Sequence, residues 1–176
     1  MTRDVVIKDA GEKGKGLFAN RDFKKGEIIL YVDLSNIKKR YTLKEIEESG
    51  IDSEHWEYVG YGKYVLDSSP LSYVNHSCDP NAYVEFKKLT ERYLIALKPI
   101  KKGEEITKDY TLEAVDQIDN ETWILKCKCG SKNCRRRVTG DFFKLPKKIQ
   151  KEKLPYLPTW VRRKYRDRIE KLEKDY

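Results

Sequence analysis

The sequence contains few histidines and few cysteines, and it contains no long apolar run. Only two histidines and four cysteines occur among its 176 residues. No stretch approaches the roughly 20 consecutive apolar residues that a transmembrane helix needs. A secretory leader is also missing, so we expect a protein that is neither membrane-bound nor secreted, with its cysteines in a reducing compartment.

The length and the charge distribution predict one domain with a basic appendage. The formal net charge is +8, but residues 1–125 carry 19 basic and 23 acidic side chains, whereas residues 126–176 carry 18 basic and 6 acidic ones. A basic segment can simply be a solvated face, or it can attract nucleic acid or another polyanion. The mildly acidic remainder of the chain would suit a cationic peptide.

The four cysteines are arranged as one residue in the middle of the chain and three close together: Cys78, Cys127, Cys129 and Cys134. Four thiolates are a preferred ligand set for structural zinc, and closely spaced cysteines supply several ligands from one loop. Four unrelated buried thiols or a disulfide are the alternatives. Because the loop is flanked by lysines and arginines, it does not resemble a core segment, and we predict a zinc site that uses all four.

Short strands and a few helices account for most of the hydrophobic pattern. Aromatic and β-branched runs predict strands at 5–7, 17–19, 27–32, 64–66, 82–86 and 92–96. Thr42 as N-cap and Glu45 at the capping-box position predict a helix over 42–49 that ends at Gly50. Residues 141–151 suggest a short helical piece interrupted by a proline, and apolar residues at helical spacing predict one last helix over 159–174. Its apolar stripe would dock on the body of the protein or contact a partner or DNA.

A glycine-rich segment follows the first strand. Gly11, Gly14 and Gly16 lie within six residues and would let a ligand approach the backbone closely. A third glycine at the position required by a dinucleotide-binding fingerprint is missing, and no helical pattern follows. A plain hairpin turn is therefore the alternative to a ligand-binding loop.

Four motifs, in this order, closely resemble SET-domain protein lysine methyltransferases with a post-SET zinc loop. They are Gly14-x-Gly16, Asn75-His76-Ser77-Cys78, the segment 105–110 that ends in Asp109-Tyr110, and the cysteine cluster. The resemblance covers about residues 5–139. It implies a mainly β (α+β) fold, the β-clip-like SET fold of small curved sheets, with a pseudoknot, short helices and a C-terminal helical extension. We expect a SET domain at 1–113, a post-SET zinc loop at 114–140 and a basic helical extension at 141–176.

The resemblance also implies a cofactor, S-adenosyl-L-methionine, and one structural Zn²⁺ ion held by the four cysteines. The residues that match the family's cofactor site are Lys13, Gly14, Lys15, Gly16, Leu17, Tyr73, Asn75, His76, Tyr110 and Trp123. In the family the histidine of this motif binds and supports the cofactor, so we expect binding and not proton transfer from His76.

The implied reaction is methylation of a lysine on a basic protein, such as a histone or another DNA-associated protein. A free lysine has a pKa of about 10.4 and is mostly protonated near neutral pH, so an apolar channel must favour the neutral amine. Tyr110 matches the family's catalytic tyrosine, and Tyr31 and Tyr64 match channel positions. Two departures are Ser72, where many relatives have arginine, and Lys108, at a position linked to the number of methyl groups added.

Two other functions remain open from the sequence. A catalytically weak SET module could act as a basic nucleic-acid- or chromatin-binding zinc protein, which would fit the basic C-terminal region and the two departures. A module that binds lysine without turnover is the second, although the retained Tyr110 argues against it. Cofactor affinity and single-turnover assays separate these possibilities. The resemblance places the protein in the cytoplasm or on chromatin.

Overall fold

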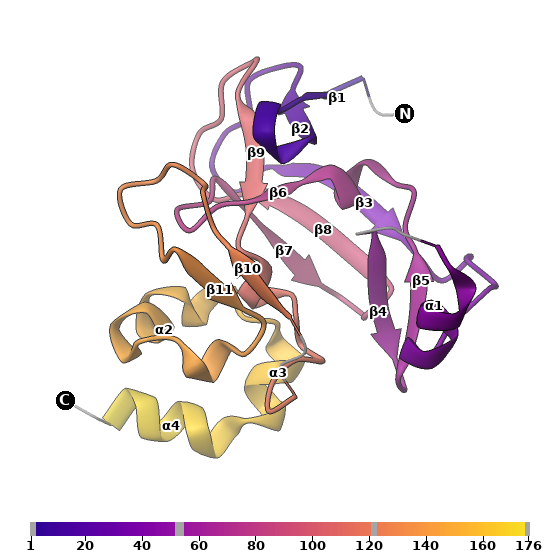
Figure 1. Ribbon diagram of the computed structural model, residues 1–176. Helices are drawn as coiled ribbons and strands as arrows, with labels where there is room; N and C mark the ends of the chain where they lie inside the picture. Colours follow the sequence, from indigo (N-terminus) through magenta and orange to yellow (C-terminus); the bar gives the residue numbers. More distant parts are fainter. Residues whose placement is uncertain (1–2, 52–54, 121–122, 175–176) are drawn as a thin grey trace. The chain divides into compact units, whose positions relative to one another are not determined.

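The computed structural model describes residues 3–51, 55–120 and 123–174. Small sheets dominate and the helices are short, which confirms the predicted fold class (Figure 1). The strands are β1 (Val5–Asp9), β2 (Lys15–Ala19), β3 (Ile28–Asp33), β4 (Trp56–Gly60), β5 (Lys63–Leu66), β6 (Asn75–His76), β7 (Ala82–Phe86), β8 (Glu91–Ala96), β9 (Glu105–Lys108), β10 (Ile124–Lys126) and β11 (Arg137–Thr139).

Each helix spans at most a few turns. The α-helices are α1 (Leu43–Ser49), α2 (Lys147–Lys153), α3 (Thr159–Lys164) and α4 (Arg166–Lys174). The 3₁₀ turns are η1 (Gly11–Lys13), η2 (Pro70–Tyr73), η3 (Tyr110–Leu112), η4 (Phe142–Lys144) and η5 (Leu154–Tyr156). Among the described residues, none of these helices has the length and apolarity that crossing a membrane would require.

The chain forms two compact units, and both are assembled from separate stretches. The first consists of Met1–Asn75 and Pro80–Lys108, and the second of His76–Asp79 and Asp109–Tyr176. The three-part division expected from the sequence and the pseudoknot both stay predictions. The boundaries of the units separate Asn75 from His76 and Lys108 from Asp109, so the two central motifs each contribute to both units.

The first unit holds three sheets around one apolar core. Their strand orders are β1-β2-β9-β6, β3-β8-β7 and β4-β5. The neighbouring strands β2 and β9 are far apart in the sequence, and their register pairs Leu17 with Ile106. Both side chains are completely buried. Alternate residues of β7 face this core: Ala82, Val84 and Phe86 are buried, whereas Tyr83 and Glu85 are half-buried. The alternation in the sequence of this strand therefore indicates which of its faces is buried.

Helix α1 confirms the predicted capping box. The Thr42 side chain accepts a hydrogen bond from the Glu45 amide, and the Glu45 carboxylate accepts one from the Thr42 amide. Gly50 ends the helix with φ = 65°, in the left-handed region that favours glycine. No residue of α1 is buried, so its caps have to supply much of its stability.

Strand β4 is an element that the sequence analysis missed. It pairs with β5 through a tight turn in which Tyr61 and Gly62 both have positive φ, 54° and 64°. This is the conformation of hairpin turns whose twist matches that of the strands. A glycine beside an aromatic residue, after a run rich in strand-forming side chains, is the signal that would have identified this hairpin.

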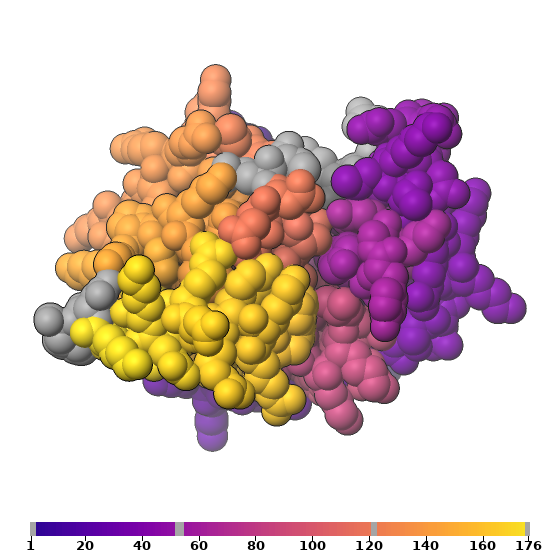
Figure 2. Space-filling view, turned by 90° about the horizontal axis from the view of Figure 1, so that it is seen from below, coloured from indigo at the N-terminus to yellow at the C-terminus, as the bar shows by residue number. Residues whose placement is uncertain are grey.

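The second unit combines the β10–β11 hairpin with the C-terminal helices. The predicted single helix over 159–174 is wrong, because the structure has α3 and α4 with a kink at Tyr165, where φ is −108°. The Tyr165 ring packs on Phe143, with ring centroids 5.3 Å apart. Val161, Ile169 and Leu172 are buried. The two helices contact each other, α4 also contacts α2, and Figure 2 shows the yellow C-terminal segment lying on the orange one.

Candidate functional site

The glycine-rich loop in the first unit folds back on itself tightly. The Ala10 amide donates to the Gly14 carbonyl at 2.7 Å, and the Gly14 amide donates to the Gly11 carbonyl at 2.9 Å. Gly14 has φ = 74°, which a side chain would disfavour. Gly16 is needed for another reason: a Cβ there would lie 2.9 Å from Asn75 Nδ2 and 2.9 Å from Glu105 Oε1. The loop is therefore shaped by close approach of Asn75, not only by turn geometry.

One carboxylate holds this loop to the Asn75 segment. Asn75 Nδ2 donates to the Lys15 carbonyl at 3.1 Å and to Glu105 Oε1 at 2.8 Å. The other oxygen of Glu105 forms an ion pair with Lys13. The sequence analysis quoted Glu105 as part of a motif but gave it no role. The residues next to Glu105 in the sequence do not indicate these contacts, because its partners Asn75 and Lys13 are 30 and 92 positions away.

A hollow of about 570 Å³ lies beside the loop. Its lining residues are Ile7, Lys8, Asp9, Gly14, Lys15 and Tyr73. Three of the predicted cofactor residues, Gly14, Lys15 and Tyr73, therefore line one hollow. Leu17 is not among the lining residues, and its side chain is fully buried in the core.

His55 and Ser72 occupy the neighbourhood of Tyr73. The Ser72 hydroxyl donates to the Ser69 carbonyl at 2.8 Å, and it lies 3.4 Å from His55 Nδ1. The His55 ring meets the Tyr73 ring edge-on at 4.7 Å. Ser72, one of the two departures noted in the sequence, therefore lies beside a histidine, and the ring of this histidine packs on the tyrosine that lines the hollow.

The two predicted channel tyrosines lie in different sheets of the first unit. Tyr31, on β3, is 48% exposed and packs on Tyr93 with ring centroids 4.9 Å apart. Tyr64, on β5, packs on Tyr58 at 5.4 Å. The channel roles of both tyrosines stay predictions.

Lys108 is buried at the end of β9. Burial alone would raise the pKa of Glu57, but the charges of Arg92 and Lys108 bring that pKa below its usual value.

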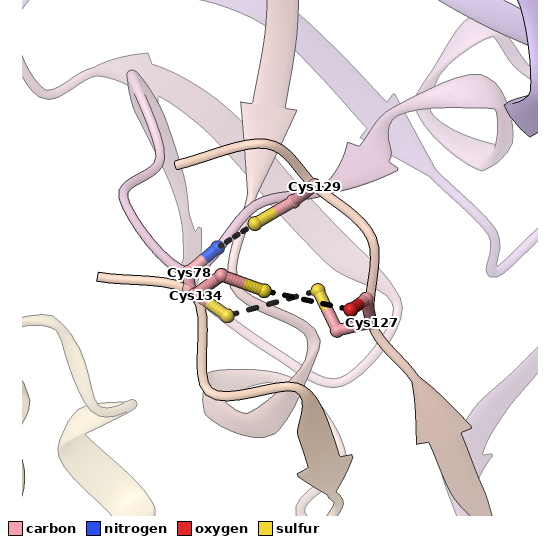
Figure 3. Close-up of side chains that lie close together, drawn as sticks. All are labelled: Cys78, Cys127, Cys129 and Cys134. Atoms are coloured by element: carbon pink, nitrogen blue, oxygen red, sulfur yellow. Dashed lines mark hydrogen bonds between the residues drawn. The ribbon is translucent and has the colours of Figure 1, made fainter. Parts of the chain in front are cut away.

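The four cysteines of the second unit converge (Figure 3). Their sulfur atoms all lie within 4.8 Å of one another, and Cys78 Sγ is 3.8 Å from Cys127 Sγ. A tetrahedral ion with sulfur ligands at about 2.3 Å has sulfur–sulfur edges of about 3.8 Å. All four are free thiols, which excludes the disulfide alternative in this structure. The residues present therefore fit a tetrahedral metal ion.

Backbone amides point at these sulfur atoms. The Arg135 amide lies 3.3 Å from Cys78 Sγ, and the Cys78 amide lies 3.5 Å from Cys129 Sγ. Burial raises the pKa of the Cys78 and Cys127 thiols. Burial also acts to raise the pKa of Cys129, but hydrogen bonds from Cys78 and Ser131 lower it to about 6. A cation bound here would ionise all four thiols, because coordination removes the thiol proton.

His76 uses both nitrogens of its ring. The Tyr110 amide donates to Nδ1 at 3.2 Å, so Nδ1 has no proton and Nε2 carries it, directed at Cys78 Sγ at 3.3 Å. Burial lowers the pKa of His76 to about 4. The charge of Asp109 acts to raise this pKa, and the charges of Arg135 and Lys153 act to lower it. A neutral ring with both nitrogens engaged is consistent with the structural role predicted for this residue. The ring links the cysteine cluster to the backbone of Tyr110.

Tyr110 begins the short turn η3, which Asp109 caps by accepting from the Thr111 amide. The Thr111 hydroxyl donates to the Thr139 carbonyl at 2.8 Å, which joins the turn to β11. The Tyr110 ring meets the His76 ring at 5.3 Å. Trp123 packs against the cluster formed by Cys78, Cys127 and Val138. Among the predicted residues of this unit, His76 and Trp123 therefore contact the cysteine cluster, and Tyr110 contacts His76.

A model of the SET domain matches residues 14–111, more than half of the chain. The protein therefore belongs to the SET-domain family. Human Histone-lysine N-methyltransferase 2B is 29% identical over 138 residues, which cover 70% of this chain and 5% of that protein. The Variant-silencing SET domain-containing protein of Plasmodium falciparum (isolate 3D7) is 32% identical over 146 residues, 75% of this chain and 6% of that protein. The chain thus spans only a small part of these relatives.

The solved methyltransferase domain of human Histone-lysine N-methyltransferase SETMAR has the same fold. It superimposes with a TM-score of 0.54 at 20% identity, covering 77% of this chain and 57% of that one. The family model ends at residue 111, so it does not cover the C-terminal helical extension.

Proposed function

We propose that the protein transfers a methyl group from S-adenosylmethionine to lysine side chains of a basic protein. The observation that carries this proposal is the hollow of about 570 Å³ beside the Gly14-Lys15 loop in a chain of the SET family. The hollow is within the size range of small-ligand sites. Tyr73 supplies an aromatic face there, and the loop supplies backbone polar groups.

The cofactor, when bound, supplies a methyl group on a positively charged sulfur. Lys13, Asn75 and Glu105 hold the loop in a fixed shape. The cofactor site needs that rigidity because an ordered backbone binds a ligand without a further entropy cost. We assign Gly14, Lys15 and Tyr73 of the first unit to cofactor contact, and the cofactor roles of His76, Tyr110 and Trp123 stay predictions from the resemblance.

The substrate amine has to lose its proton before it can react. A free lysine ammonium has a pKa of about 10.4, and an apolar channel with a positive charge at its end favours the neutral amine. In this proposal the Tyr110 hydroxyl orients the amine, whereas the channel roles of Tyr31 and Tyr64 stay predictions from the resemblance. The reaction then depends mainly on alignment, so the position of Tyr110 is decisive.

The cysteine cluster holds one structural zinc ion in this proposal. Four buried or half-buried thiols with sulfur atoms within 4.8 Å match the ligand number and geometry of a closed zinc site. A site without an open coordination position has no catalytic task. The ion would fix Cys78, and through it the neighbouring His76, relative to the loop that carries Trp123.

The substrate is a lysine-containing basic protein, such as a histone or another DNA-associated protein. Several relatives carry the name histone-lysine N-methyltransferase. The excess of acidic side chains in residues 1–125 would attract a cationic peptide. A location on chromatin or in the cytoplasm fits such a substrate.

The proposal is tested with purified protein, methyl-labelled S-adenosylmethionine and a panel of basic proteins, with product lysines identified by mass spectrometry. Tyr110→Phe keeps the ring but removes the hydroxyl, and we expect a loss of roughly 100-fold or more in kcat, as for other single transition-state donors. Tyr61→Phe is the matched control, because Tyr61 is fully exposed on the β4–β5 turn and should retain full activity.

Cofactor binding decides between this proposal and the non-catalytic alternative. A protein that fails to bind S-adenosylmethionine, and instead binds DNA in a salt-sensitive way, would be a nucleic-acid-binding zinc protein on a SET scaffold. Methyl transfer that Tyr110→Phe leaves unchanged would contradict the role of this hydroxyl.

A further inference from the structure

Asp109 is a completely buried carboxylate with a cation on each oxygen. Arg135 Nη2 donates to Oδ1 at 2.6 Å, and Lys153 Nζ lies 3.0 Å from Oδ2. The side chains of Arg135 and Lys153 are only 8% and 11% exposed. Burial would raise the pKa of Asp109, but the two cations keep it below its usual value. Asp109 is therefore ionised, and one cation would suffice to neutralise it.

The second cation has a further neighbour that explains its burial. Lys153 Nζ lies 3.4 Å from the carbonyl oxygen of Cys78, one of the four converging cysteines. Four thiolates around one zinc ion carry two negative charges in excess. Such a centre would offset the positive charge that Arg135 and Lys153 leave after pairing with Asp109. Lys153 thus bridges the cysteine cluster and the carboxylate through one ammonium group.

The carboxylate is directly connected to the predicted catalytic tyrosine. Asp109 precedes Tyr110 and caps its turn through the Thr111 amide. Asp109 Oδ1 also lies 3.7 Å from His76 Nδ1, the atom that accepts the Tyr110 amide. A shift of the Asp109 carboxylate would therefore move the turn that sets the direction of the Tyr110 ring.

Lys153 comes from the C-terminal extension, 42 residues beyond the end of the SET match at 111. It is the last residue of α2. The helix is anchored by the buried Gln150, whose amide donates to the carbonyls of Phe143 and Leu145 at 3.0 and 2.6 Å. Helix α4, with Ile169 buried, packs against α2. These contacts hold the C-terminal end of α2, and with it Lys153, beside Asp109.

We propose that Lys153 is a positioning residue for methyl transfer, through which the C-terminal extension fixes the Asp109-Tyr110 turn. The inference rests on the proposed function for its kinetic consequence, but its structural part does not. It gives the extension a task inside the active centre, separate from any contact that its basic surface makes.

The test compares four variants of the full chain. Lys153→Met and Lys153→Gln remove the charge at similar length, and Lys153→Arg keeps it. Lys148→Met removes an exposed lysine from the same helix and is the matched control. For each protein we would measure the zinc content, kcat and KM for a basic substrate, and hydrogen exchange of individual amides by NMR.

We expect the two neutral variants to retain about one zinc ion while kcat falls about 10- to 100-fold, the range that small misplacements produce. KM should change less than threefold. The Tyr110 amide, which is bonded to His76, should exchange at least tenfold faster relative to the Ile169 amide of α4. Lys153→Arg should recover most of both losses, and Lys148→Met should match the wild type.

If hydrogen exchange becomes faster by the same factor at the Tyr110 and Ile169 amides, the proposal is overturned, because this result would indicate a general loss of stability. Unchanged kcat in a folded neutral variant would do the same. Failure of both neutral variants to fold, with Lys153→Arg fully active, would assign Lys153 to structural support alone. If the wild type transfers no methyl group at all, the proposed function fails, whereas the exchange of the Tyr110 amide still decides whether Lys153 holds the turn.

Discussion

Replacing Cys127 by serine should remove the metal from the second unit. Cys127 is buried, and its sulfur lies 3.8 Å from that of Cys78, the edge length of a zinc–thiolate tetrahedron. A serine oxygen is a shorter and harder ligand that stays protonated near neutral pH. The variant would therefore offer three sulfur atoms and a poor fourth ligand.

The expected magnitude follows from linkage between metal binding and folding. At a free zinc concentration 100 times the dissociation constant, bound metal contributes about 2.7 kcal/mol to stability. A 100-fold loss of affinity would remove most of this. For a chain of this size about 1 kcal/mol shifts the melting temperature by roughly 2–4 °C, so a loss of about 2.3 kcal/mol should make Cys127→Ser melt about 5–9 °C below the zinc-loaded wild type.

The assay measures zinc by mass spectrometry after loading in a metal buffer, together with thermal melting with and without a chelator. Asn133→Ser is the control, because it places a serine at an exposed position of the same loop without removing a thiol. We expect one equivalent of zinc in the wild type and in this control. Less than half an equivalent in the wild type, or full zinc content and an unchanged melting temperature in Cys127→Ser, would refute the four-thiolate site.

Three further changes test the loop, a helix cap and a buried ion pair. Gly16→Ala adds a Cβ 2.9 Å from Asn75 Nδ2 and should weaken S-adenosylmethionine binding at least tenfold in calorimetry, whereas unchanged affinity would show that the loop tolerates displacement. Thr42→Ala removes the N-cap of the exposed helix α1 and should lower the free energy of unfolding, measured in urea, by about 1 kcal/mol. Thr42→Ser should have a stability close to that of the wild type. Glu57→Gln removes the charged partner of the buried Arg92 and should lower the free energy of unfolding by roughly 3–5 kcal/mol at neutral pH. Because the folded-state pKa of Glu57 is lowered, its contribution is present above the usual glutamate pKa and disappears as pH falls through the folded value, so the difference between this variant and the wild type should shrink in acid.

Local patterns in the sequence were sufficient for the elements whose signals are local. The capping box of α1 is complete within four residues, and strand β7 alternates buried apolar residues with the half-buried Tyr83 and Glu85. The cysteine cluster was also predictable, since thiols in a short polar loop have few other uses. The missed strand β4 belongs here too, because its turn residues were visible in the sequence but were not interpreted.

The ion pairs and hydrogen bonds that charged side chains make between distant segments were not predictable, and they decide how the site is supported. Glu105 joins Lys13 to Asn75 across 92 and 30 positions, and Lys153 reaches the Cys78 carbonyl across 75. In the sequence, Lys153 is one of many lysines in a basic segment, and nothing marks it as buried. Helix spacing likewise predicted one helix where the structure has two, α3 and α4, which meet at Tyr165.

The sequence by itself therefore determined the chemistry that the chain carries: the thiols, the glycine loop, and the histidine and tyrosine motifs. The tertiary structure decided which charges support those groups. The physical reason is that a metal-ligand set and a backbone turn depend on residue type and short spacing, whereas the energy of an ion pair depends on distance and burial. Folding alone sets those two quantities, as the Asp109 carboxylate between Arg135 and Lys153 shows.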